Sequence, residues 1–176
     1  MNIRDSLNFH TYIEHSNSLL IAADCNLELL KESFNSNPNS RLKSLGLFKS
    51  TKLLYAVSLE LILKARGLYE ERNNIMSGEI SSFNGFLNKW KGKTNGHDFV
   101  KIIETYKIEI NEDDKRMLNE MSEFTNWAGR FPYPKKESIV IEMEKKGRDL
   151  GSIGSRYKMW ANEFHKRQVN IMATNL

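Results

Sequence analysis

An arginine set among aromatic residues is the first candidate for chemistry in this sequence. Trp127, Arg130 and Tyr133 lie close together, and Pro132 and Pro134 follow the arginine. Each proline fixes its own φ and favours extended geometry before it, so the preceding helix cannot run past Arg130. A guanidinium beside aromatic rings suits the recognition of phosphates and bases. It equally suits a packed corner in which Arg130 satisfies helix-terminal carbonyls.

A histidine next to an aspartate is the second candidate. His97 could act as a general base, with a carboxylate to orient its ring. The same residues also read as a helix start, with Thr94 or Asn95 as the N-cap and Asp98 near the positive end of the dipole. Adjacent helical residues point in different directions, so spacing alone does not make His97 and Asp98 a catalytic pair.

Two pairs of ionisable residues have the spacing of one helical turn. Glu60 and Lys64 occur in the most apolar stretch of the chain. They form either a solvated contact on a narrow exposed strip or a buried pair near a site. His10 and Glu14 share the spacing, but no third ligand accompanies them, and we expect no metal site.

Basic residues alternate with an aromatic residue in the segment Lys89, Trp90, Lys91 and Lys93. Cations next to an aromatic ring can contact the phosphates and stack on the bases of single-stranded nucleic acid. A solvated lysine-rich loop is the alternative. The net charge of +4 and the pI near 9.1 permit a nucleic-acid partner without requiring one.

Length and composition indicate an ordinary globular protein. The 176 residues suit one domain, 1–176, with a sizeable core. The single Cys25 excludes an intrachain disulfide and fits a reducing cytoplasm. We recognise no signal peptide and no transmembrane span, and we therefore expect a cytoplasmic protein without membrane contact.

Helical periodicity predicts the elements that must position these residues. We expect helices over about 9–34 and 41–72, a loop with a short helix at 83–90, and further helices starting near 97, after 111 and near 152–155. Residues 53–65 are apolar nearly all round, which predicts that the second helix lies at the centre and that Leu61 belongs to the core. Residues 138–143 are β-prone but lack a partner strand. The prediction is an all-α, four- to five-helix bundle.

Three motifs resemble those of HEPN (higher eukaryote and prokaryote nucleotide-binding) domains. They read AVSLELILKA at 56–65, GHDFVKII at 96–103 and WAGRFP at 127–132, and they follow the family's order over about 53–134. The resemblance implies an all-α bundle, often dimeric, that belongs to bacterial defence, toxin–antitoxin or RNA-processing systems. Catalytic members are metal-independent ribonucleases with an Arg, a polar neighbour and a His one to two helical turns downstream.

The catalytic pattern of the family is not found at its usual place. The first histidine after Arg130 is the distant His165, and only Arg4 with His10 has a matching spacing, at the extreme N-terminus. We therefore predict a HEPN-like RNA- or nucleotide-binding protein without cofactor or metal. It is expected to form a homodimer and to have room for a partner protein.

Two alternatives remain open, an active metal-independent ribonuclease and a non-catalytic interaction module. The catalytic candidates are His97, Arg130, Arg4 and His10. The expected RNA- or nucleotide-binding residues are Arg130, Trp127, Tyr133, Lys89, Trp90, Lys91 and Lys93.

Overall fold

The chain folds into helices throughout the part that the structure describes. The computed structural model describes residues 3–35, 41–90, 96–125, 137–146 and 152–174, and no strand occurs in these ranges. Among the described helices, none combines the length and the apolar character that a membrane crossing requires. The elements in chain order are a 3₁₀ helix Ile3–Leu7, α1 Phe9–Asn35, α2 Arg41–Glu70, α3 Arg72–Met76, α4 Phe83–Asn88, α5 Phe99–Tyr106, α6 Glu112–Glu123, α7 Glu137–Lys146 and α8 Ser155–Ala173.

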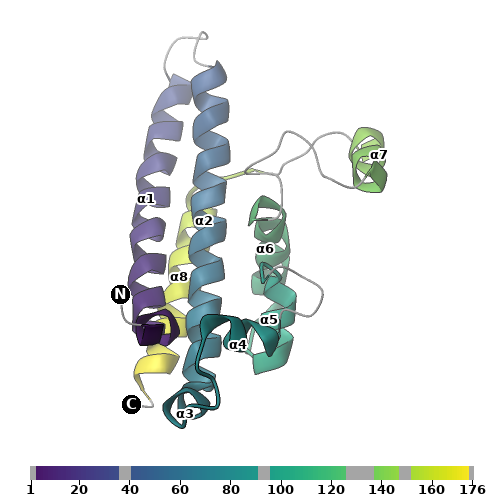
Figure 1. Cartoon of the computed structure of the whole chain (residues 1–176). Coiled ribbons are helices and arrows are strands. Elements are labelled where there is room, and N and C mark those ends of the chain that lie inside the picture. The colour runs from purple at the N-terminus through teal and green to yellow at the C-terminus, as the bar shows by residue number, and fades with distance from the viewer. Residues whose placement is uncertain (1–2, 36–40, 91–95, 126–136, 147–151, 175–176) are drawn as a thin grey trace.

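The two longest helices, α1 and α2, form an antiparallel hairpin against which the other helices of the bundle pack (Figure 1). Ser16 and Ser58 hold the helices together, because each hydroxyl donates to the other residue's carbonyl oxygen, at 2.8 and 2.9 Å. Helix α2 also contacts α5, α6 and α8. Its expected position at the centre of an all-α bundle is therefore confirmed.

The core surrounds α2 on most of its circumference. Leu61 is not part of it, contrary to our expectation. It is half-buried, as are Val57 and Leu53, which precede it by one and two helical turns on the same face. The large apolar residues of α2 that are buried instead include Tyr55, Leu59, Ile62, Leu63 and Leu68.

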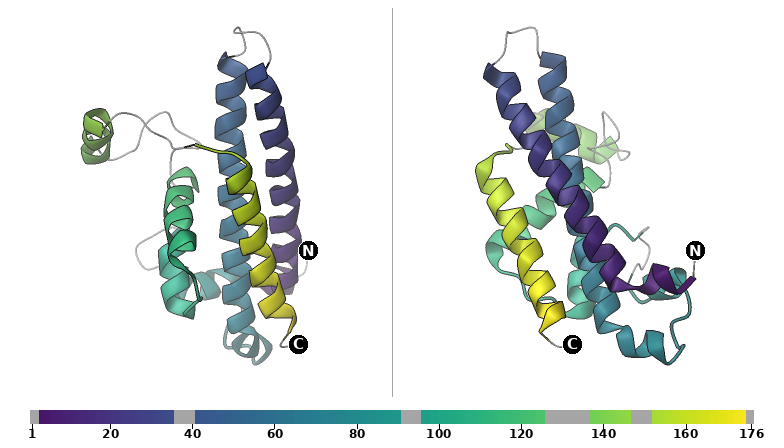
Figure 2. Two further views of the ribbon diagram at one scale, coloured as in Figure 1. Left: turned by 180° about the vertical axis from the view of Figure 1, so that it is seen from behind. Right: turned by 90° about the vertical axis from the view of Figure 1, so that its left-hand side faces the viewer.

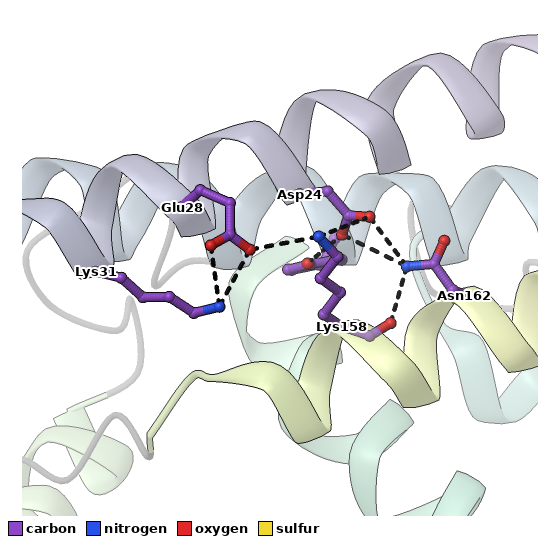
Figure 3. Close-up of polar contacts among 6 residues, drawn as sticks. Asp24, Glu28, Lys31, Lys158 and Asn162 are labelled. Atoms are coloured by element: carbon purple, nitrogen blue, oxygen red, sulfur yellow. Dashed lines mark hydrogen bonds and ion pairs between the residues drawn. The ribbon is translucent and has the colours of Figure 1, made fainter.

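A polar network attaches α8 to the hairpin (Figure 3). Asp24 on α1 accepts from the Tyr55 hydroxyl at 2.5 Å and from Asn162 Nδ2 at 3.2 Å. Lys158 on α8 lies 3.4 Å from Glu28 and 3.8 Å from Asp24. Because Tyr55 is on α2, the Asp24 carboxylate links three helices at one point.

A buried lysine links the other side of the bundle. Lys52 on α2 is fully buried, and its Nζ lies 2.5 Å from Glu120 Oε1 on α6. The ammonium also lies 5.0–5.5 Å from the ring centroids of Phe48, Phe124 and Tyr157. Cation–π attraction and the carboxylate together compensate for the lost hydration of the charge.

The β-prone segment at 138–143 is helical. It forms most of α7, which stands apart from the bundle in Figures 1 and 2. Glutamate, methionine and lysine favour a helix, and Glu137 lies in the first turn, where the helix dipole favours an acid. A single segment without a neighbouring strand gains nothing from extended geometry.

Candidate functional site

The first candidate pair, His97 and Asp98, is separated by a helix boundary. Asp98 is the N-cap of α5, and its Oδ1 accepts from the amide N–H of Lys101 at 3.0 Å. The N-cap is therefore Asp98 and not Thr94 or Asn95. Because this carboxylate caps the helix, it does not orient the imidazole of His97.

The carboxylate that orients His97 belongs to Glu60. His97 Nδ1 lies 3.0 Å from both oxygens of Glu60, and Lys64 Nζ donates to Glu60 Oε1 at 2.5 Å. Glu60 and Lys64 are only 7% and 9% exposed, whereas the His97 side chain is 36% exposed. The sequence left open whether Glu60 and Lys64 lie on an exposed strip or near a site. The pair is buried, and His97 contacts it.

The geometry fixes the protonation pattern of the imidazole. A carboxylate oxygen can only accept, so the Nδ1 atom that faces Glu60 carries a proton. The other ring nitrogen, Nε2, is then left to accept or to donate a proton on the exposed edge. A histidine held in one tautomer by a carboxylate is the arrangement that general acid–base catalysis uses. It is also a sound way to anchor the start of a helix.

Apolar side chains fill the space below this cluster. Leu63, Trp90, Phe99 and Ile102 line the depression next to His97, and its free volume is about 0 Å³. Gly96 also lines this depression. Its φ of 79° lies in the left-handed region that favours glycine. Within the described residues, this depression therefore has no room for a ligand beside His97.

Trp90 is a core residue and does not present a stacking surface. The residue is 2% exposed, and its ring meets Phe86 edge to face with centroids 6.0 Å apart. This contradicts the expectation that its ring is free to stack on bases. Lys89 is exposed, with its Nζ 3.5 Å from Glu79 Oε1, a weak surface contact.

The remaining predicted residues do not join this cluster within the described part of the chain. His10 lies exposed in the first turn of α1, next to Phe9. Within the described ranges, no three His, Cys, Asp or Glu side chains gather in a way that could hold a metal ion. The residues Lys91, Lys93, Trp127, Arg130 and Tyr133, and the side chain of Arg4, lie outside the described residues.

The contact between Glu60 and His97 is the part of this site that the sequence did not reveal. The two residues are 37 positions apart and come from α2 and from the start of α5. One signal was present, because a charged pair in a buried, largely apolar stretch of helix is stable only if further polar groups satisfy it.

The chain has no match among protein-family models, curated proteins or solved structures.

Proposed function

We propose that this chain is a HEPN-like protein that binds single-stranded RNA next to His97, in a bacterial defence, toxin–antitoxin or RNA-processing system. One observation carries the proposal, the imidazole of His97 held by buried Glu60 with its outer edge exposed. The basic segment that contains Lys89 runs directly up to this histidine in sequence. Trp90 lines the same depression as His97, which brings the start of the segment to the same place.

Charge explains why phosphate is the expected partner. Lys64 offsets the charge of Glu60, so the buried pair does not repel a phosphate beside His97. Lys89 supplies a positive charge close in sequence, and phosphate contacts position a nucleic acid without reading its sequence. The burial of Trp90 removes the expected stacking contact, so we expect modest affinity that depends strongly on salt.

Salt-dependent binding tests the proposal. Fluorescence anisotropy of a labelled single-stranded RNA gives the binding constant at several salt concentrations. We expect the triple change Lys89→Glu, Lys91→Glu, Lys93→Glu to weaken binding to unrelated sequences and to reduce the salt slope by about 0.7 for each lysine that touches a phosphate. Lys43→Glu, the same charge reversal at a single exposed position of α2, is the control and is compared with Lys89→Glu alone. Unchanged binding by the triple variant, or equal weakening by the control, contradicts this surface.

The second candidate function is a metal-independent ribonuclease, and the orientation of His97 by Glu60 favours it. A histidine with a fixed tautomer can remove a proton from a ribose hydroxyl or donate one to a leaving oxygen. The test is cleavage of RNA in the presence of a chelator by wild type and by His97→Ala, with circular dichroism to check the fold. If the folded His97→Ala variant no longer cleaves RNA, the chain is a ribonuclease that uses His97. If cleavage persists, His97 is not a catalytic residue. A chain that neither binds nor cleaves RNA is the interaction module.

A further inference from the structure

A charged groove lies between α6 and α8, both of which can be followed in Figure 2. It consists of two adjoining depressions of about 180 and 480 Å³, and both are lined by Asp113, Trp160 and Glu163. Neither depression shares a lining residue with the one beside His97. The larger depression has the size of a small-molecule site.

A buried carboxylate holds the groove in shape. Asp114 is 1% exposed, and its Oδ1 accepts from Trp160 Nε1 at 2.9 Å and from Arg167 Nη2 at 2.6 Å. Its Oδ2 accepts from the amide N–H of Asn111 at 3.1 Å as part of the capping box of α6. The half-buried Trp160 ring therefore has a fixed place in the wall, and Arg167 has a fixed anchor.

Cations stand at both ends of the groove. Arg116 and Arg156 line the smaller depression, and Lys166 and Arg167 line the larger one. Arg156 and Arg167 are eleven residues apart on α8, which is about 16 Å along the helix axis. Trp160 lies between them in sequence, and its side chain lines both depressions. The groove thus offers an aromatic wall in the middle and guanidinium or ammonium groups on either side.

Carboxylates occupy the centre of the groove. Asp113 lies 2.9 Å from Arg116 Nη2 and 3.9 Å from Arg156 Nη2, and Glu163 lines both depressions. The two arginines are exposed, so their ion pairs with Asp113 are weak, and each guanidinium has further N–H groups to donate. Central carboxylates can accept hydrogen bonds from sugar hydroxyls, whereas they repel a phosphate placed there.

From this distribution we infer that the groove binds a nucleotide that carries a phosphate on each side of its sugar. The base stacks on Trp160, the one free ribose hydroxyl, at the 2′ position, donates to Asp113 or Glu163, and the two phosphates reach the cationic ends. A free nucleoside bisphosphate and one unit of a single-stranded RNA share this chemistry. The site is separate from the RNA contact proposed at His97 and goes beyond it.

Titration calorimetry with the full chain tests the inference. The probes are adenosine, adenosine 5′-phosphate, adenosine 3′,5′-bisphosphate, inorganic phosphate and a short oligoadenylate. We expect the bisphosphate to bind at least about ten-fold more tightly than the monophosphate, because a second charge-assisted contact is added. An oligoadenylate that binds about as tightly as the bisphosphate identifies a free nucleotide as the ligand. One that binds at least ten-fold more tightly identifies a strand.

Variants at the two cationic ends of the groove, which we call its rims, distinguish this site from the one at His97. Arg156→Ala and Lys166→Ala should each lower the affinity for the bisphosphate about ten-fold, while Lys43→Ala leaves it unchanged. Thermal unfolding checks that the variants are folded, and both rim residues are exposed. The inference is overturned if the bisphosphate binds no better than inorganic phosphate, or if the rim variants bind as wild type. Either result leaves the proposal at His97 intact.

Discussion

Glu60 is the residue on which the candidate site depends, since it faces both a buried ammonium and an imidazole. Glu60→Gln leaves Lys64 buried without a counter-charge, and we expect it to lower the free energy of unfolding by about 3–5 kcal/mol. His97→Gln, at a half-exposed position, should cost about 1 kcal/mol. Urea denaturation measures both. A Glu60→Gln variant as stable as wild type would show that water reaches Lys64.

His165 on α8 makes stability depend on pH. Burial lowers the pKa of its imidazole below the ordinary value of about 6.5. The folded state therefore favours the neutral ring, and this contribution is fully present above pH of about 6.5 and is lost as the pH falls below it. We expect wild type to lose more stability between neutral and acidic pH than His165→Gln. If the free energy of unfolding falls by the same amount in both proteins over this pH range, the prediction is wrong.

At the scale of single residues, sequence reasoning found candidates but not their partners. His97, Glu60 and Lys64 were all singled out, yet helix spacing says nothing about a contact between α2 and the start of α5. Trp90 shows the opposite error. Its lysine neighbours made it look like a surface residue, but the Phe86 ring and the wall of the depression bury it.

Within α2, the buried and half-buried faces should respond differently to truncation. Leu63 is fully buried, and Leu63→Ala should cost about 2–5 kcal/mol, because it removes apolar surface from the core and leaves a cavity. Leu61→Ala should cost about half as much, because its side chain already meets solvent. Chemical denaturation of the two variants provides the comparison. Equal costs would indicate that another part of the chain covers Leu61.

The helices themselves followed from apolar periodicity, and helix ends and exposed sides were harder to predict. The starts of α1, α2 and α8 lie where turn formers and periodic residues placed them. The all-round apolar stretch of α2 gave no sign that Leu61 faces outward, because a half-exposed leucine looks the same in sequence as a core leucine. Residues 138–143 are likewise helical in spite of their β-propensity, because helix-forming residues lie among and beside them.

As a whole molecule, the chain presents apolar side chains that its own core leaves uncovered. Leu29, Leu42 and Leu45 are exposed on the α1–α2 hairpin, which extends beyond α6 and α8 in Figure 1. Tyr157 and Phe164 are buried in the chain's own core, so they do not indicate a partner.

We predict that a homodimer covers part of the hairpin. Light scattering at micromolar concentration should give twice the chain mass, and Leu42→Glu with Leu45→Glu should give the single mass while the helical circular dichroism signal is retained. Lys115→Glu, at an exposed position of α6 outside the hairpin, is the control for added negative charge. A monomeric wild type at these concentrations rules the dimer out.

The burial of Lys52 makes it a chemical reporter of motion. Its amine lies where α2, α6 and α8 meet, enclosed by Glu120 and three aromatic rings. An acetylating reagent can reach it only after these helices separate, so its labelling rate, read by mass spectrometry, follows the opening of the bundle. Lys43, exposed on the same helix, gives the rate of an unprotected amine in the same sample. The ratio of the two rates then measures how often the bundle opens around Lys52, without any engineered label.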